Sequence, residues 1–385
     1  MNAITIEPVD AANRKDREAF VDCGRAFAAG TPNAVPQLRS EQLELIDPAR
    51  NPFFAHASVQ LFLAKRGGEC VGRISAHIDH EAEKTPPEQG FGPGSGAFGY
   101  FDAADAEIAA QLLQTAEAWL KDHGVSRVLG PLSLSIWEEP GLLIKGFEHP
   151  PMIMMGHHPV HYREWIEAAG YRHEKSLYTY ALPVQREFPP IVGRIVKSGE
   201  RNPRINVRPL NLRNYDEEVQ TVLRILNDAW SGNWGFVPFT DREIAYAAKK
   251  LKPILHPDIN LIAELDGRPV AFIMTIPNVN DVLRETGGKL FPFGWIKMLR
   301  WLRKPKGTGM RVPLMGVLKE FHNSRMASQL AFMMIDRIRR VSADKFQAVD
   351  GEVGWILDDN QGMVAIAEAI DSDINREYAI YVKEI

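Results

Sequence analysis

The chain has 385 residues, 45% hydrophobic and 24% charged, a balance typical of globular proteins with enough apolar material for two cores. Its 45 basic and 49 acidic side chains leave a net charge of −4, which argues against nucleic-acid partners and against anionic membranes. Two cysteines are too few for a disulfide framework or a four-thiolate zinc site, so we expect no metal. The N-terminus does not resemble a signal peptide, and no apolar run approaches the roughly 20 residues that span a bilayer. These features predict a cytoplasmic protein.

The first half of the chain predicts an alternation of strands and helices. Residues 62–79 carry two apolar runs around the turn Gly67-Gly68, which is the pattern of a β-hairpin. Between the other apolar runs, hydrophobic side chains recur at helical spacing. The other expected strands are 3–10, 96–105, 127–133 and 175–184, and the expected helices are 17–30, 106–124 and 161–171.

The second half repeats this order of elements. Its hairpin, 261–278, aligns with 62–79 at a constant offset, so that Ala64 corresponds to Ala263 and Ile74 to Ile273. The other expected strands are 205–211, 311–321, 346–357 and 378–385, and the expected helices are 215–230, 326–340 and 362–370. The sequence therefore predicts an α/β protein with a mixed sheet in each half. We expect two similar domains, 1–183 and 205–385, joined by a Pro- and Arg-rich linker at 184–204.

The order of strands and helices in each half resembles that of the GNAT acyltransferase superfamily, and the whole chain resembles a tandem GNAT protein. In that family the loop Gln/Arg-x-x-Gly-x-Gly/Ala holds the pyrophosphate of coenzyme A on the N–H groups of a helix N-terminus. The matching residues in the second half are 322–327. His322 takes the first position and Ala327 the last, while Arg325 replaces the middle glycine. An arginine there either blocks the anion or swings outward and pairs with it, and we expect the second.

The resemblance implies an acyl-CoA site in the second half. The strand before the loop would present its backbone to the pantetheine arm, and a later family asparagine corresponds to Asn360. The residues implied in binding acetyl-CoA or a longer acyl-CoA are Val317, Leu318, His322, Arg325, Met326, Ala327, Ser328 and Asn360.

The matching loop of the first half argues against a second acyl-CoA site. Its positions fall on Ala104, Asp105 and Glu107, and the two carboxylates would repel a pyrophosphate. We expect residues 1–183 to lack a coenzyme A site, to pack on the second half and to shape a cleft with it.

The catalytic groups implied by the family are incomplete. Ala367 occupies the position of the tyrosine that usually protonates the leaving thiolate. Tyr378 and Tyr381 on the final strand are candidates to replace it, although such tyrosines are more often packing residues. Glu352 is the candidate base, with a salt-bridged structural carboxylate as the alternative.

Two further segments bear on the substrate. Residues 134–155 are apolar and Pro-rich, which suits either a pocket wall or packing between the halves. Residues 291–307 predict a basic amphipathic helix, with Trp295, Leu299 and Leu302 on the apolar face. Such a helix touches membranes or long acyl chains, or it covers an apolar groove. We expect the last of these, with the apolar face buried and no membrane contact.

The resulting hypothesis is an acyl-CoA-dependent N-acyltransferase acting on a small or amphipathic amine. The missing tyrosine and loop glycine leave open an alternative, a non-catalytic GNAT-fold binding or regulatory protein. Neither the acceptor nor the length of the acyl chain follows from the sequence, and a homo-oligomer is left open.

Overall fold

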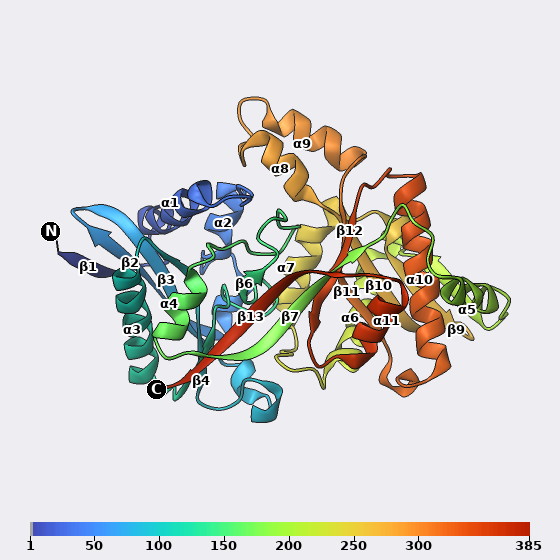
Figure 1. Ribbon diagram of the computed structural model, residues 1–385, viewed down its shortest axis with the longest axis horizontal. Helices are drawn as coiled ribbons and strands as arrows, with labels where there is room; N and C mark the ends of the chain where they lie inside the picture. The colour runs from blue at the N-terminus through green and yellow to red at the C-terminus, as the bar shows by residue number, and fades with distance from the viewer. Residues whose placement is uncertain (1–2) are drawn as a thin grey trace.

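The computed structural model describes residues 3–385, and its centre is one continuous mixed sheet of 13 strands (Figure 1). The strand order is β1-β2-β3-β4-β5-β13-β7-β12-β11-β10-β9-β8, and the short strand β6 pairs with β13. The pairs β4–β5 and β11–β12 are parallel. The mixed α/β architecture expected from the sequence is confirmed.

The strands of the first half are β1 (Ile4–Val9), β2 (Ala57–Arg66), β3 (Glu69–Asp79), β4 (Ser95–Ala103), β5 (Arg127–Gly130), β6 (Leu142–Lys145) and β7 (Arg172–Leu182). Those of the second half are β8 (Ile205–Pro209), β9 (Leu261–Leu265), β10 (Arg268–Pro277), β11 (Met310–Val317), β12 (Gly351–Leu357) and β13 (Ile374–Glu384). The α-helices are α1 (Arg14–Gly30), α2 (Arg39–Leu45), α3 (Ala106–Asp122), α4 (Tyr162–Ala168), α5 (Pro190–Glu200), α6 (Tyr215–Trp230), α7 (Asp241–Leu251), α8 (Val279–Thr286), α9 (Gly294–Arg303), α10 (Arg325–Asp344) and α11 (Gln361–Ala369).

The two halves exchange their last strands. β13, the final strand of the chain, lies between β5 and β7 of the first half, and β7 in turn lies between β13 and β12 of the second half (Figure 1). Residues 378–382 of β13 are completely buried, because strands continue on both sides and packed layers cover both faces. The chain therefore has a shared sheet rather than two separate ones. The boundaries 1–183 and 205–385 stay a prediction about units of folding.

Part of the expected linker is helical. Residues 190–200 form α5, with Pro190 in the first turn, where its missing N–H leaves no bond unmade. Val192 and Val196 join the core of the second half. Gly199 lies so close to α10 that an added Cβ would come within 2.2 Å of the sulfur of Met333. The spacing of four residues between Val192 and Val196 is typical of a helix. The neighbouring proline and arginine residues led to the prediction of a linker instead.

The expectation that the apolar face of the 291–307 segment is buried is wrong. Helix α9 has no buried residue, and Trp295 and Leu299 are 46% and 42% exposed. Leu302 is only partly covered. With α8, this helix forms a pair that projects from one long side of the molecule, at the top of the view (Figure 1). Amphipathic periodicity predicted an apolar face correctly, but it does not specify what covers that face.

The two cysteines are joined. Cys23 on α1 and Cys70 at the start of β3 form a disulfide that ties the helix to the sheet. The sequence-based argument excluded a framework of several disulfides but did not anticipate this single one.

None of the helices formed by residues 3–385 combines the length and the apolar character needed to traverse a lipid bilayer.

Candidate functional site

Strands β11 and β12 diverge in the second half. Their parallel pairing joins Met310–Val312 to Gly351–Val353 and ends there. β11 then continues along β10 to Val317, while β12 pairs with β7 as far as Leu357. Within residues 3–385, no strand therefore pairs with the edge of residues 313–317 that faces away from β10, and the opening between the two strands is wedge-shaped.

Helix α10 starts after a short turn that follows β11. Asn323 is left-handed, with φ 58°, and the Ser324 hydroxyl caps the helix by accepting the N–H of Ala327. Helix geometry leaves the N–H groups of Arg325 and Met326 without intrahelical partners at the positive end of the helix dipole. The Arg325 side chain is exposed and forms no ion pair with residues 3–385. This combination fits an anionic group such as a pyrophosphate.

The other residues implied in acyl-CoA binding lie in two places. The His322 ring turns back onto the strand, its Nε2 2.7 Å from the carbonyl oxygen of Val317. The N–H of Leu318 donates to the carbonyl of Val270, so it already takes part in sheet pairing. Ser328 follows Ala327 in the first turns of α10. Asn360 instead caps α11, where it accepts the N–H of Met363.

An aromatic cluster from both halves faces the open edge of β11. The Trp230 indole donates to the carbonyl of Met315, 2.9 Å away. Trp137, from the segment 134–155, stacks on Trp230 and on Phe239, with ring centroids 5.9 and 4.3 Å apart. Trp355 on β12 packs on the edge of Trp230. The sequence left residues 134–155 as either a pocket wall or packing between the halves, and tryptophans distant in the chain gave no signal that they would meet.

The corresponding opening in the first half is filled by the chain itself. Pairing of β4 with β5 stops at Ala97 and Leu129, as in the second half. Beyond it the N–H of Leu132 donates to the carbonyl of Phe98, and the N–H of Tyr100 donates to the hydroxyl of Ser133. A Cβ on Gly99 would come within 1.8 Å of the Leu132 oxygen. Little room remains for a ligand between these strands.

The start of α3, next to this filled opening, is also unsuited to an anion. Asp105 caps the helix by accepting the N–H of Ile108, which is 2.9 Å away. Arg66 pairs with both Asp105 and Glu107, so the nearby cation is already neutralised.

Glu352 lies in a buried ionic network. The side chain is 0% exposed, and one carboxylate oxygen accepts from Arg376 and from Asn375. Arg311, also buried, donates to the carbonyls of Ile153 and Gly354. Burial lowers the pKa of Arg311 to about 10, although the charge of Glu352 opposes this. This geometry favours the structural alternative for Glu352, because a base must reach its substrate.

The two candidate acids are separated. The Tyr378 hydroxyl donates to the carbonyl of Gly156, and burial raises the pKa of Tyr378 well above its usual value. The Tyr381 hydroxyl lies 3.4 Å from a carboxylate oxygen of Glu167 on α4. Burial and the charge of Glu167 raise the pKa of Tyr381 to about 12. Both shifts weaken these groups as proton donors, and only Tyr378 lies near Glu352.

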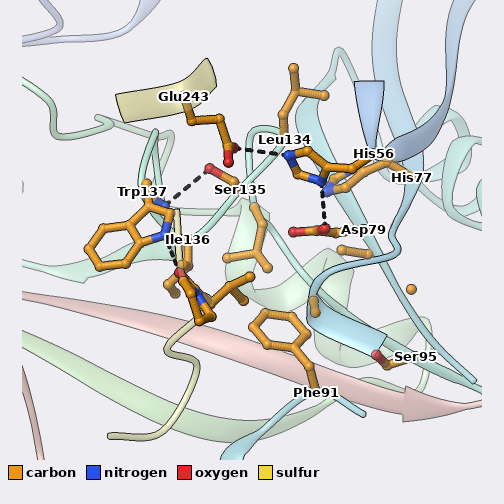
Figure 2. A pocket seen from close by; sticks show the side chains of 16 residues that line it. His56, His77, Asp79, Phe91, Ser95, Leu134, Ser135, Ile136, Trp137 and Glu243 are labelled. Carbon is orange, nitrogen blue, oxygen red and sulfur yellow. Dashed lines mark hydrogen bonds and ion pairs between the residues drawn. The ribbon is translucent and has the colours of Figure 1, made fainter. Parts of the chain in front are cut away.

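A small pocket that contains two histidines and two carboxylates lies where the second half meets the first (Figure 2). His56 stands between two carboxylates, its Nδ1 3.0 Å from Asp79 and its Nε2 3.1 Å from Glu243 on α7. A second ion pair, Lys250–Glu44, ties α7 to α2. Sequence reasoning missed this site, because a lone histidine and a helix-capping glutamate far along the chain carry no local motif.

This small pocket has room for little more than water. His77 in its wall is 1% exposed, and neither ring nitrogen has a hydrogen-bond partner among residues 3–385, although the Leu134 backbone lies near. The cavity offers about 20 Å³ to the centre of a water molecule, enough for one or two waters. The ion pairs His56–Glu243 and Lys250–Glu44 beside the pocket connect the two halves.

The contacts of His56 with Asp79 and Glu243 predict that the free energy of unfolding of the protein depends on pH. The hydrogen bond to Asp79 raises the pKa of His56 to about 9, with a contribution from the charge of Glu243 and opposition from burial. Because the folded pKa exceeds the ordinary value of 6.5, the stabilisation is fully present below about pH 6.5 and is lost as pH rises through about 9. We expect His56→Gln to lower the free energy of unfolding by about 1–2 kcal/mol at pH 6 and by much less at pH 10.

Urea unfolding of both proteins across this pH range measures the effect. His123→Gln, at an exposed histidine after α3, is the matched control and should show no such trend. A His56→Gln difference that stays constant with pH would contradict the prediction.

The repeated order of elements, the divergent β11–β12 pair and the helix behind it define a tandem GNAT protein. The fold is similar to that of a tandem GNAT protein from the clavulanic acid biosynthesis pathway, with a TM-score of 0.58 over 99% of this chain and 98% of that one at 10% identity. A GCN5-related N-acetyltransferase from Sphaerobacter thermophilus matches with a TM-score of 0.53 over 98% and 95% at 12% identity. At these identities the likeness establishes the fold alone.

Two other proteins are much more similar to this chain in sequence than these two solved structures are. The chain is 40% identical to the bacterial ceramide synthase of Caulobacter vibrioides over 95% of this chain and 94% of that protein. It is 38% identical to Protein YghO of Escherichia coli over 97% and 94%. No protein-family model matches. The chain belongs to the family of GNAT-fold proteins that includes these two relatives.

Proposed function

We propose that this protein is an acyl-CoA-dependent N-acyltransferase that acts on a long-chain amine. A ceramide is the fatty-acid amide of a long-chain amino alcohol, so a ceramide synthase forms an amide bond between an acyl group and an amine. The identity to the ceramide synthase extends over nearly the whole of both chains, which supports the same class of reaction here. A long-chain acyl-CoA fits this proposal better than acetyl-CoA.

The observation that carries the proposal is the β11–β12 opening beside the N-terminus of α10. We assign the pantetheine arm to the free edge of β11 near Val317 and the pyrophosphate to the N–H groups of Arg325 and Met326. The filled opening of the first half and the paired Asp105 support a single donor site, in the second half.

The proposed reaction is a direct transfer. The neutral amine nitrogen attacks the thioester carbonyl and the new C–N bond forms. The nitrogen gives up one proton, the C–S bond breaks, and the thiolate leaves as coenzyme A and takes up one proton. N–H groups along a strand edge are suited to stabilising the negative oxygen of the intermediate. Trp137, Trp230 and Trp355 would form the wall of the acceptor cleft between the halves, where their apolar faces suit a hydrocarbon chain.

The roles of Glu352 as base and of Tyr378 or Tyr381 as acid stay predictions. The two tyrosines pack in different core clusters. The cytoplasmic location predicted from the sequence is retained as part of the proposal.

Reversing the charge of Arg325 tests the donor site. We expect Arg325→Glu to weaken binding of a long-chain acyl-CoA by about tenfold or more, because a charge-assisted contact worth roughly 1.5–3 kcal/mol becomes a repulsion. Glu107→Arg, at the corresponding helix of the first half, should leave affinity unchanged. Calorimetric titration of both variants measures the effect.

Unchanged binding by Arg325→Glu, or a loss with Glu107→Arg, would contradict the assignment of the donor site. Tight acyl-CoA binding without amide formation on any long-chain amine would favour the non-catalytic alternative.

A further inference from the structure

We infer that helix α9 and the turn before it dock on the surface of an anionic lipid bilayer. The docking surface consists of residues 289–306, and the inference rests on its exposure and charge alone. It does not depend on the proposed function, because vesicle binding requires neither donor nor acceptor. It replaces the expectation of a buried amphipathic helix without membrane contact.

The docking surface exposes large apolar side chains without a protein partner. Phe291 and Phe293 in the turn are 81% and 74% exposed, and on the helix Trp295 and Leu299 are nearly half exposed. Scattered apolar residues are ordinary on protein surfaces, but four within nine consecutive positions form a patch. Three of the four are aromatic, and aromatic rings favour the boundary between lipid headgroups and acyl chains.

The same residues carry a concentrated positive charge. Residues 289–306 contain six cations and no carboxylate, although the chain as a whole carries −4, so the remaining residues carry −10. Lys297 pairs with Glu285 on α8. The other five form no ion pair with residues 3–385: Lys289, Arg300, Arg303, Lys304 and Lys306. The net charge of the whole chain does not reveal this concentration, because it averages over segregated charge.

The arrangement of the two kinds of side chain favours a bilayer over other partners. Along α9 the less exposed residues, Met298, Trp301 and Leu302, share one side of the helix. Trp295 lies beside Leu302, seven residues away, and from it the exposed surface continues around the helix through Leu299 to Arg303 and Arg300. Apolar groups that enter the acyl boundary, flanked by cations that contact phosphate, are the arrangement of helices that lie in a membrane interface.

The position of the docking surface in the fold permits such contact. The α8–α9 pair projects from one long side of the molecule, at the top of the view (Figure 1). Residues 304–309 connect α9 directly to β11, the strand with the open edge.

Sedimentation of the full-length protein with lipid vesicles tests the inference. We expect binding to vesicles that contain phosphatidylglycerol, little binding to pure phosphatidylcholine, and a fall in binding when salt rises from about 0.1 M to about 0.5 M. Arg300→Glu/Arg303→Glu should reduce the apparent partition coefficient by about tenfold or more, and so should Phe291→Ser/Phe293→Ser.

Matched controls lie on other faces of the molecule. Arg194→Glu/Lys197→Glu changes two exposed cations of α5 by the same charge, and Ile191→Ser/Ile374→Ser removes two exposed apolar side chains. These controls should bind as the unaltered protein does. Equal losses in controls and docking-surface variants would overturn the inference, as would absence of binding to phosphatidylglycerol at low salt. Dissociation of a dimer by Phe291→Ser/Phe293→Ser, without vesicle binding by the unaltered protein, would assign the surface to a second copy of the chain and overturn it too.

Discussion

Glu352→Ala is expected to destabilise the protein by about 3–5 kcal/mol, because it leaves Arg376 as an uncompensated charge in the interior. Arg376 is 3% exposed and donates to Glu352 and to the carbonyl of Pro150. Arg311 nearby would lose a favourable charge as well. The carboxylate thus holds together β12, β13 and the loop of the first half that contains Pro150.

A double variant provides the control for Glu352→Ala. Glu352→Met/Arg376→Met removes both charges with similar volume, and replacing a buried pair in this way often costs far less than removing one partner. Urea unfolding of Glu352→Met, of Arg376→Met and of the double variant yields the coupling energy. A loss below about 1 kcal/mol for Glu352→Ala would contradict the structural role.

The same site tests the prediction that Glu352 is the base. Glu352→Gln keeps the shape of the side chain and its hydrogen bond to Asn375. A folded Glu352→Gln protein that binds acyl-CoA normally but no longer forms amide would support the catalytic role. Normal turnover would leave Glu352 as a structural residue.

Reduction of the Cys23–Cys70 disulfide is expected to lower the free energy of unfolding by about 2–4 kcal/mol. The bridge closes a loop with a sequence separation of 47 residues, and most of its effect in the chain-entropy model is to restrict the unfolded chain. Urea unfolding with and without a reducing agent measures the loss. Cys23→Ser/Cys70→Ser is the control, and its stability should not respond to the reductant.

The disulfide also bears on where the protein resides. Such bonds persist in oxidising compartments and are rare in the cytoplasm. Two free thiols in protein isolated under alkylating conditions would agree with the cytoplasmic location, and the stabilisation by the bridge would then be absent in the cell. A full complement of bonded cysteines would contradict that location.

Much of the fold follows from local patterns that the chain displays directly. The two hairpins, the repeated order of elements and the start of α10 at Arg325 agree with the sequence-based expectations. Each depends on neighbours within a few residues: turn glycines, alternating or helical apolar spacing, and a serine that caps a helix.

The tertiary structure decided which distant elements meet. The edge of β5 in the first half and the edge of β12 in the second half can each pair with β7 or with β13. Local periodicity does not choose between these pairings, so the exchange of β7 and β13 was not foreseeable. The pairing of Glu352 with Arg376, of His56 with Glu243 and of Trp137 with Trp230 depends on that arrangement. The exposure of α9 likewise depends on what the rest of the fold leaves uncovered. An amphipathic sequence determines that a helix has an apolar face, and only packing determines whether that face meets protein or lipid.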